Sequence, residues 1–229
     1  TLKILMVNPP AENILSGNND ETGFIDTGDF GYFPPLGMLY VVSYLEEHTE
    51  GHEIFFKDCI AEQITHEELR AYIQELQPDV VGVTSFTVSL IDVVMVGRSV
   101  REVAPLSHIC MGGHHPIAFP LQAAQLPEFD SIIVGEGEYA FTELVNCLAA
   151  NEDFTKITGV YTSSSIKPFM SKNMPRDRRF LQSVMVPPAY VDNLEDLPMP
   201  NRKYIRHIKY HSTIGVSGNL ATIITTRGC

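Results

Sequence analysis

Asp79-Val-Val-Gly-Val83 is the stretch of sequence that decides the fold of this chain. It is short, apolar after its first residue and rich in valine, which is typical of a strand buried on both faces. Thr84-Ser-Phe-Thr87 follows, and residues 88–103 then have the length and apolar spacing of a helix. A buried strand that leads through a short loop into a helix predicts one β-α unit of a parallel sheet.

The same unit recurs on both sides of this stretch. Further strands are expected at residues 2–7, 53–57, 107–111 and 131–134, and further helices at 36–47, 65–76, 116–125 and 139–150. The second of these helices begins at Thr65 with Glu68 three residues on, the pattern of a capping box. Five such units predict an α/β fold over residues 1–150. It is a doubly wound, five-stranded parallel sheet of the flavodoxin or Rossmann kind, in the order 2-1-3-4-5.

The pattern changes after residue 150. Residues 151–215 contain several turn-forming and proline-rich stretches, and only residues 157–161 resemble a strand. We expect a linker with a small hairpin here. Residues 220–225 then have the β-branched composition of a strong strand that no helix follows, so residues 216–229 are expected to be the first strand of a further, truncated domain.

Composition narrows the functional class. The chain has 229 residues and a net charge of −12, which disfavours nucleic acid and anionic membrane surfaces as partners. It has no apolar run long enough for a membrane span, and it begins with a core strand in place of a signal peptide, so a cytoplasmic location is expected. Cys59, Cys110 and Cys147 are far apart, include no CxxC pair, and are predicted to be buried, reduced thiols.

Ligands of open parallel sheets bind outside the carboxyl ends of the strands, so the loops that follow the strands hold the candidate site residues. No GxGxxG follows the first strand and no phosphate-binding P-loop motif occurs, which argues against dinucleotides and P-loop nucleotides. The candidates are Asn8, Pro9, Thr84, Ser85, Phe86, Thr87, Gly112, Gly113, His114, Gly135, Glu136, Gly137 and Glu138.

Each of these loops also has a structural interpretation. The hydroxyls of residues 84–87 either cap the next helix or bind a ligand, and residues 135–138 either form a turn and helix start or line a site. The paired glycines 112 and 113 let a flat ligand approach the backbone. His114 and His115 are adjacent and point apart, which disfavours a metal site. The long acidic loop between Pro10 and Pro34 is either solvated or a flap over a ligand.

Taken together and in order, these loops resemble the cobalamin-binding domain that precedes the barrel in cobalamin-dependent radical S-adenosylmethionine (SAM) enzymes. The resemblance covers nearly the whole chain. It rests on Asn8-Pro-Pro10, Pro34-Pro-Leu-Gly-Met-Leu-Tyr40, Gln77-Pro-Asp-Val-Val-Gly-Val83, Gly112-Gly-His-His-Pro116, Val134-Gly-Glu-Gly-Glu138, Asp196-Leu-Pro-Met-Pro200 and Thr226-Arg-Gly-Cys229.

The resemblance implies cobalamin at the carboxyl edge of the sheet, with its nucleotide tail inserted between strands. Ser85 and Thr87 would hydrogen-bond that tail, Gly112 and Gly113 would flank it, and residues 135–138 would line its far side. Cobalamin proteins of the mutase and methyl-carrier type place Asp-x-His-x-x-Gly after the first strand, but no histidine occurs here before His48. We therefore expect no histidine from this loop on cobalt, whose lower face would be open, water-bound or covered by a side chain of the long loop.

Cys229 takes its expected role from the same resemblance. In radical SAM enzymes the first barrel strand ends in Arg-Gly-Cys, and this cysteine opens a CxxxCxxC motif whose three thiolates hold a 4Fe–4S cluster. Cys229 is thus the expected metal ligand, and no catalytic residue is expected in this chain.

The favoured function is the cobalamin-binding domain of a radical SAM enzyme that uses the cluster and SAM on a small-molecule substrate. The reaction would be methyl transfer to an unactivated carbon or an oxidative cyclisation of the magnesium-protoporphyrin ester type. This chain alone would not turn over. Two alternatives stay open: a non-catalytic, flavodoxin-like sensor or docking module, and a domain that has kept this fold and lost cobalamin.

Overall fold

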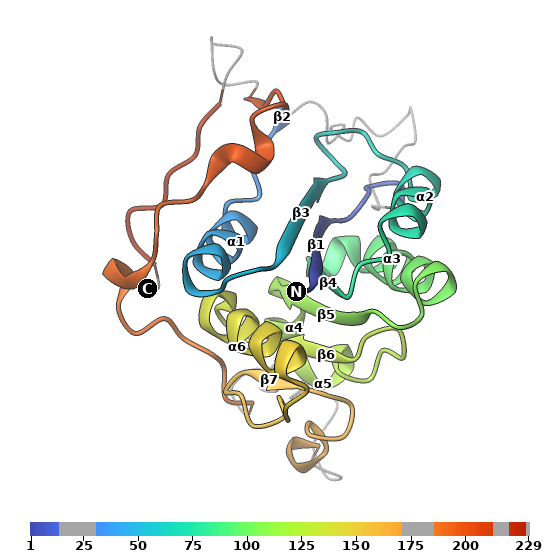
Figure 1. Cartoon of the computed structure of the whole chain (residues 1–229), viewed down its shortest axis with the longest axis vertical. Helices are drawn as coiled ribbons and strands as arrows, with labels where there is room; N and C mark the ends of the chain where they lie inside the picture. The colour runs from blue at the N-terminus through green and yellow to red at the C-terminus, as the bar shows by residue number, and fades with distance from the viewer. Residues whose placement is uncertain (14–30, 171–185, 213–219, 228–229) are drawn as a thin grey trace, which may run out of the picture.

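The computed structural model describes residues 1–13, 31–170, 186–212 and 220–227. A six-stranded sheet runs through it in the order β3-β1-β4-β5-β6-β7 (Figure 1). The strands are β3 (Glu53–Asp58), β1 (Lys3–Asn8), β4 (Val80–Ser85), β5 (His108–Gly113), β6 (Ser131–Ile133) and β7 (Val160–Tyr161). The first five are mutually parallel, and β7 is antiparallel to β6. The predicted order 2-1-3-4-5 is therefore confirmed, with one antiparallel edge strand added.

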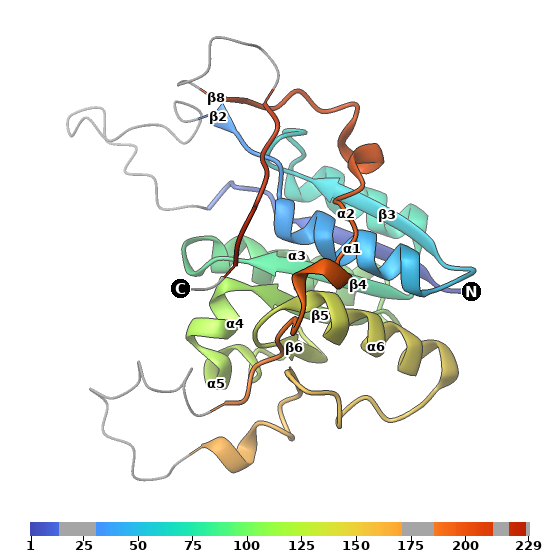
Figure 2. The ribbon, with the colours of Figure 1, turned by 90° about the vertical axis from the view of Figure 1, so that its left-hand side faces the viewer.

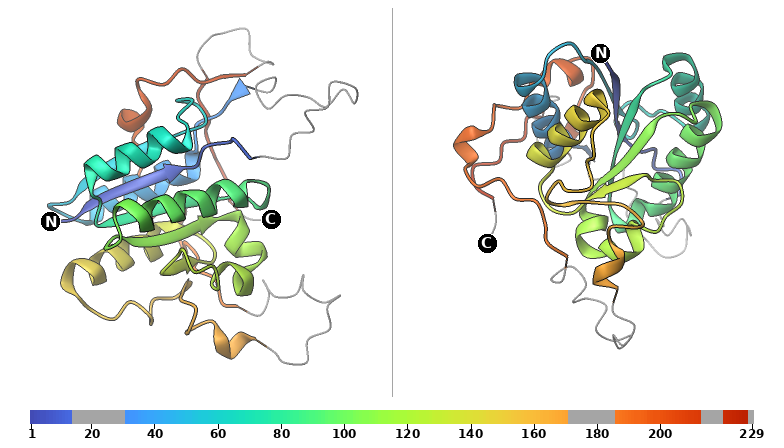
Figure 3. Two further views of the ribbon diagram at one scale, coloured as in Figure 1. Left: turned by 90° about the vertical axis from the view of Figure 1, so that its right-hand side faces the viewer. Right: turned by 60° about the horizontal axis from the view of Figure 1, so that its bottom comes forward.

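Helices cover both faces of the sheet (Figure 3). The pair α1 (Leu36–His48) and α6 (Gly137–Ala150) packs on one face, and the pair α2 (His66–Leu76) and α3 (Leu90–Val103) packs on the other. Two short helices, α4 (His114–Ala118) and α5 (Pro120–Ala123), replace the single helix expected at residues 116–125. Thr65 caps α2, and its side chain and Glu68 form the predicted capping box.

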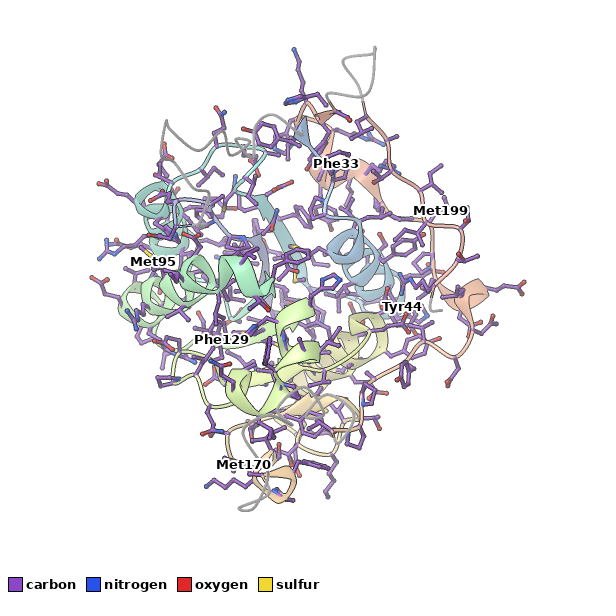
Figure 4. The ribbon with its side chains drawn as sticks, turned by 180° about the vertical axis from the view of Figure 1, so that it is seen from behind. Phe33, Tyr44, Met95, Phe129, Met170 and Met199 are labelled. Atoms are coloured by element: carbon purple, nitrogen blue, oxygen red, sulfur yellow. The ribbon has the colours of Figure 1, made fainter. Side chains whose placement is uncertain are left out.

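The sheet separates two hydrophobic cores because successive side chains of a strand point to opposite faces. Leu5, Val81 and Ile109 belong to the core under α2 and α3, whereas their neighbours Ile4 and Val80 belong to the core under α1 and α6. Among the side chains that Figure 4 labels, Phe129 belongs to the core on the α3 side, and Tyr44 lies where α1 meets α6. Burial on both faces explains why the strands are continuously apolar.

The segment after α6 folds back onto this domain. The amide of Ala189 donates to the carbonyl of Val134 at 2.8 Å, so the chain passes the end of β6. It then crosses α1, where the amide of Asn201 donates to Oγ of Ser43 at 2.6 Å. Finally β8 (His211–Ser212) pairs antiparallel with β2 (Gly31–Tyr32). The expected linker is thus packed against the domain over its described length.

Two expectations for the C-terminal part differ from the structure. In the described part of residues 151–215, β7 and β8 pair with β6 and β2 and form no hairpin with each other; residues 171–185 lie outside the described residues. Residues 220–227 form no strand in this structure, and their expected place as the first strand of a further domain stays a prediction. A strand needs a neighbour for its backbone hydrogen bonds, and this segment lies beside side chains instead. Ile223 is accordingly 70% exposed.

None of the helices in the described ranges is long and apolar enough to cross a membrane. The long loop between Pro10 and Pro34, expected to be a solvated loop or a flap, lies largely outside the described residues.

Candidate functional site

A cleft of about 770 Å³ lies at the carboxyl edge of the parallel strands. Its walls come from the ends of β1, β4, β5 and β6, the start of α1 and the segment before the C-terminus. The predicted site residues that line it are Asn8, Pro9, Thr84, Phe86, Gly112, Gly113, His114, Gly135, Glu136, Gly137 and Glu138. The structure therefore brings the four loops of the sequence prediction together around one cavity.

The two paired glycines differ in what their missing side chains would meet. A Cβ added at Gly112 would have no heavy atom within 4 Å, so this backbone faces open space in the cleft. Gly113 has a φ of +91°, and a Cβ there would lie 2.6 Å from the carbonyl oxygen of Ser85. Gly112 thus leaves room for a ligand, whereas Gly113 is required by the backbone turn between β5 and α4.

Ser85 and Thr87 lie apart from the other predicted residues. The Ser85 side chain is fully buried, and its hydroxyl donates to the carbonyl of Gly112 at 2.7 Å. The hydroxyl of Thr87 lies 3.2 Å from Nδ1 of His115, a buried side chain whose pKa is lowered by burial. Neither residue lines the cleft, so their expected contact with a ligand tail stays a prediction. In this structure Ser85 instead supports the backbone that forms the floor.

An aromatic pair forms one wall. The rings of Phe86 and His114 are stacked with their centroids 4.7 Å apart and their planes 14° from parallel. Both residues line the cleft, and Phe86 is 49% exposed. A half-exposed ring that is held by a stacked neighbour presents a rigid apolar surface to a flat ligand.

Asn8 is oriented by a buried carboxyl group. Its Nδ2 donates to Oδ1 of Asp58 at 2.7 Å, and Oδ2 of Asp58 accepts from the hydroxyl of Tyr210 at 2.8 Å. Burial raises the pKa of Asp58 above its usual range, although these hydrogen bonds act in the opposite direction. The Asn8 side chain is therefore held in place from the β3 side, and Tyr210 ties the C-terminal segment to the same point.

The two acidic residues at the start of α6 have a cationic partner. Nη2 of Arg227 lies 2.6 Å from Oε1 of Glu138, and Nη1 lies 3.3 Å from Oε1 of Glu136. The guanidinium group also lies 4.7 Å from the centre of the Tyr40 ring on α1. The sequence pointed to the acidic residues and to the Arg-Gly-Cys motif separately, and it did not show that they meet.

Part of the cleft lining was not among the residues predicted from the sequence. Phe33, Pro34 and Pro35 lead into α1, and Ile224 lies on the C-terminal segment. The Pro34-Pro-Leu-Gly37 stretch was the signal in the sequence for this part of the lining. It contributes to the family resemblance, but no place in the site was predicted for it.

The structure identifies no metal centre within the described ranges, where no three His, Cys, Asp or Glu side chains are grouped closely enough. Cys229, the expected ligand, lies outside the described residues. Cys59 and Cys110 are buried as expected, and burial raises the pKa of the Cys110 thiol to about 12, whereas Cys147 is only partly buried.

Comparison with known proteins agrees with this geometry. The model of the family described as B12 binding domain matches residues 30–145. An uncharacterized methyltransferase of Pyrococcus horikoshii is 28% identical over 229 residues, which cover 100% of this chain and 43% of that protein. The anaerobic magnesium-protoporphyrin IX monomethyl ester cyclase of Cereibacter sphaeroides is 31% identical over 124 residues, 53% of this chain and 20% of the cyclase.

Among solved structures, the cobalamin-dependent S-adenosylmethionine radical enzyme OxsB, with aqua-cobalamin and S-adenosylmethionine bound, matches with a TM-score of 0.59 and 16% identity. The match covers 87% of this chain and 24% of OxsB, and at this identity it shows a common fold. The chain spans less than half the length of the curated relatives it matches.

Proposed function

This chain belongs to the B12 binding domain family, and we propose that it holds cobalamin in the carboxyl-edge cleft as one part of a longer radical SAM enzyme. The observation that carries the proposal is the backbone of Gly112, which faces open space in a cleft of about 770 Å³ lined by the loops of the matched region. Ligand clefts of the order of 300–1,000 Å³ are typical of cofactor sites.

The residues of the cleft fit this cofactor. Gly112 allows the ligand to reach the backbone, and the Phe86–His114 pair offers a flat apolar wall. Asn8, which is oriented by Asp58, would accept a hydrogen bond from an amide of the ligand through its side-chain oxygen. Ser85 fixes the floor from below through the Gly112 carbonyl. These residues bind and orient the ligand and exclude water from the face that they cover.

Bound cobalamin would supply methyl-group transfer or redox chemistry at its cobalt, and the protein would supply binding and orientation. The match to the Pyrococcus methyltransferase spans the whole chain, whereas the cyclases match only about half of it. This difference favours methyl transfer over cyclisation. The proposal assigns Cys229 to a 4Fe–4S cluster, with SAM and the small-molecule substrate bound by the part of the enzyme that follows.

The proposal is tested by incubating the chain with hydroxocobalamin, desalting it and recording the corrin spectrum. We expect the chain to elute coloured with close to one corrin per chain. The matched control is Gly112→Leu, which places a side chain in the open space of the cleft and should elute colourless. A colourless wild-type chain at micromolar concentration would refute cobalamin binding and favour a domain that has kept the fold without the cofactor.

The role of Cys229 needs a longer chain of the same protein that continues through the following domain. Such a chain should bind iron and sulfide after anaerobic reconstitution, and Cys229→Ala should remove most of both. Unchanged iron content in Cys229→Ala would refute its assignment as a ligand.

A further inference from the structure

Arg227 connects three segments that are distant in sequence. Its side chain is only 18% exposed, and its two terminal nitrogens contact Glu138 at 2.6 Å and Glu136 at 3.3 Å. The same guanidinium lies over the ring of Tyr40. Burial acts to lower the pKa of Arg227, but the hydrogen bonds and charges of the two glutamates outweigh it and raise that pKa. Arg227 is therefore charged and held at the start of α6.

The two glutamates are not interchangeable surface charges. Glu138 is 2% exposed and lies in the first turn of α6, where a negative charge is favoured by the helix dipole. Oε2 of Glu136 accepts from the amide of Val191 at 2.6 Å, so this carboxylate is also held by the segment that follows β7. The buried carboxylate of Glu138 would be costly without a cationic partner, which makes its contact with Arg227 structurally significant.

The contact matters because of where the chain runs before it. Residues 220–227 pass the carboxyl ends of the strands, as the dark red segment of Figure 2 shows, and Ile224, Thr226 and Arg227 line the cleft. Upstream, the amide of Leu220 donates to the carbonyl of Tyr210, and Nη2 of Arg202 donates to the carbonyl of Thr222. At the cleft itself, the side chain of Arg227 holds the segment.

We propose that Arg227 is a positioning residue that fastens residues 224–227 as one wall of the cleft and thereby sets how firmly the cleft retains its ligand. The inference rests on the proposed cobalamin site for its ligand, while the fastening rests on the contacts of Arg227 alone. Removal of the guanidinium would free this wall, and a bound corrin would then leave more easily.

The fastening is tested first without cofactor. Thermolysin cleaves before large apolar residues and needs a locally unfolded segment, so its rate of cleavage before Ile224, which lines the cleft, reports how often this segment leaves the cleft. Arg227→Gln should raise that rate by roughly tenfold, a change equivalent to about 1.4 kcal/mol. Arg70→Gln is the matched control. Arg70 on α2 donates from two nitrogens to Glu102 on α3, away from the cleft, so this variant should leave the cleavage rate unchanged. An unchanged rate in Arg227→Gln would overturn the proposal.

Retention is tested second, by loading each variant with hydroxocobalamin and following corrin loss after dilution. Arg227→Gln should lose corrin roughly tenfold faster than wild type, and Arg227→Lys should fall between them because it keeps the charge and loses the two-pronged contact. Arg227→Gln leaves the buried carboxylate of Glu138 without its partner, which could by itself disturb the fold. The double variant Arg227→Gln/Glu138→Gln removes that unpaired charge and should lose corrin as fast as Arg227→Gln. If Arg227→Gln is cleaved faster than wild type but loses corrin at the same rate, the role of Arg227 in retention is overturned and the fastening of the segment stands. A wild-type chain that never retains corrin would refute the proposed function, and the thermolysin result would still decide the fastening.

Discussion

The adjacent glycines at the end of β5 give opposite predictions for the same substitution. Gly113→Ala forces alanine into a φ of +91° and a ψ of −163°, a region that is essentially restricted to glycine and costs about 1–3 kcal/mol. It also places the Cβ within 3.0 Å of Ser85 backbone atoms, which adds roughly 1–3 kcal/mol. The expected loss of stability is therefore about 2–6 kcal/mol. Gly112→Ala meets nothing within 4 Å and restricts the unfolded chain, so it should stabilise by about 0.4–1 kcal/mol.

The assay is thermal and urea unfolding of the two variants beside wild type, followed by cobalamin retention after desalting. In a chain of this size each kcal/mol corresponds to roughly 2–4 °C, so Gly113→Ala should melt roughly 4–24 °C lower and Gly112→Ala at or slightly above the wild-type temperature. Gly112→Ala should nevertheless retain less corrin, because its methyl group occupies the cleft. Equal losses of stability at both positions would refute the distinction between a backbone requirement and a ligand space.

Two further predictions concern buried polar groups outside the cleft. Asp92 is fully buried, lies 2.7 Å from Nε2 of His66 and accepts from Nδ2 of Asn13 at 2.8 Å. Asp92→Ala should therefore lower the free energy of urea unfolding by about 3–5 kcal/mol, and a loss no larger than that of the exposed control Glu102→Ala would contradict this. Burial lowers the pKa of His115, so the folded state binds fewer protons than the unfolded state and stability falls as the pH drops below about 6.5. In His115→Gln, the free energy of urea unfolding over roughly pH 5–7 should depend less steeply on pH, by up to about 1.4 kcal/mol per pH unit. An unchanged slope would show that His115 does not contribute to the loss of stability in acid.

The strands and helices of residues 1–150 were predictable because their signals are local. The continuous apolar composition of strands that are buried on both faces and the capping box at Thr65 are written into neighbouring residues, and the structure confirms both. The described part of residues 151–215 contains no hairpin, and residues 220–225 have no strand partner in the described residues. A strand is defined by a partner far away in sequence, as β7 shows by pairing with β6 and β8 by pairing with β2.

The candidate site divides in the same way. Residues after strand ends could be chosen from the sequence because a parallel sheet places all carboxyl ends at one edge, and most of them line the cleft. Ser85 could not be placed in advance, since the sequence does not show that its hydroxyl is bonded to the Gly112 carbonyl.

The sequence by itself determined the fold class and the edge of the sheet where a ligand would bind, because the apolar composition of strands and the composition of loops act over a few residues. The strand order followed from the fold class, since doubly wound sheets of this kind share it. Only the tertiary structure decided which of the two glycines leaves room for a ligand, since that depends on a φ angle and on the atoms around it. It also decided that Arg227 meets Glu136 and Glu138, because an ion pair between residues about ninety positions apart exists only once the chain has folded back across the sheet.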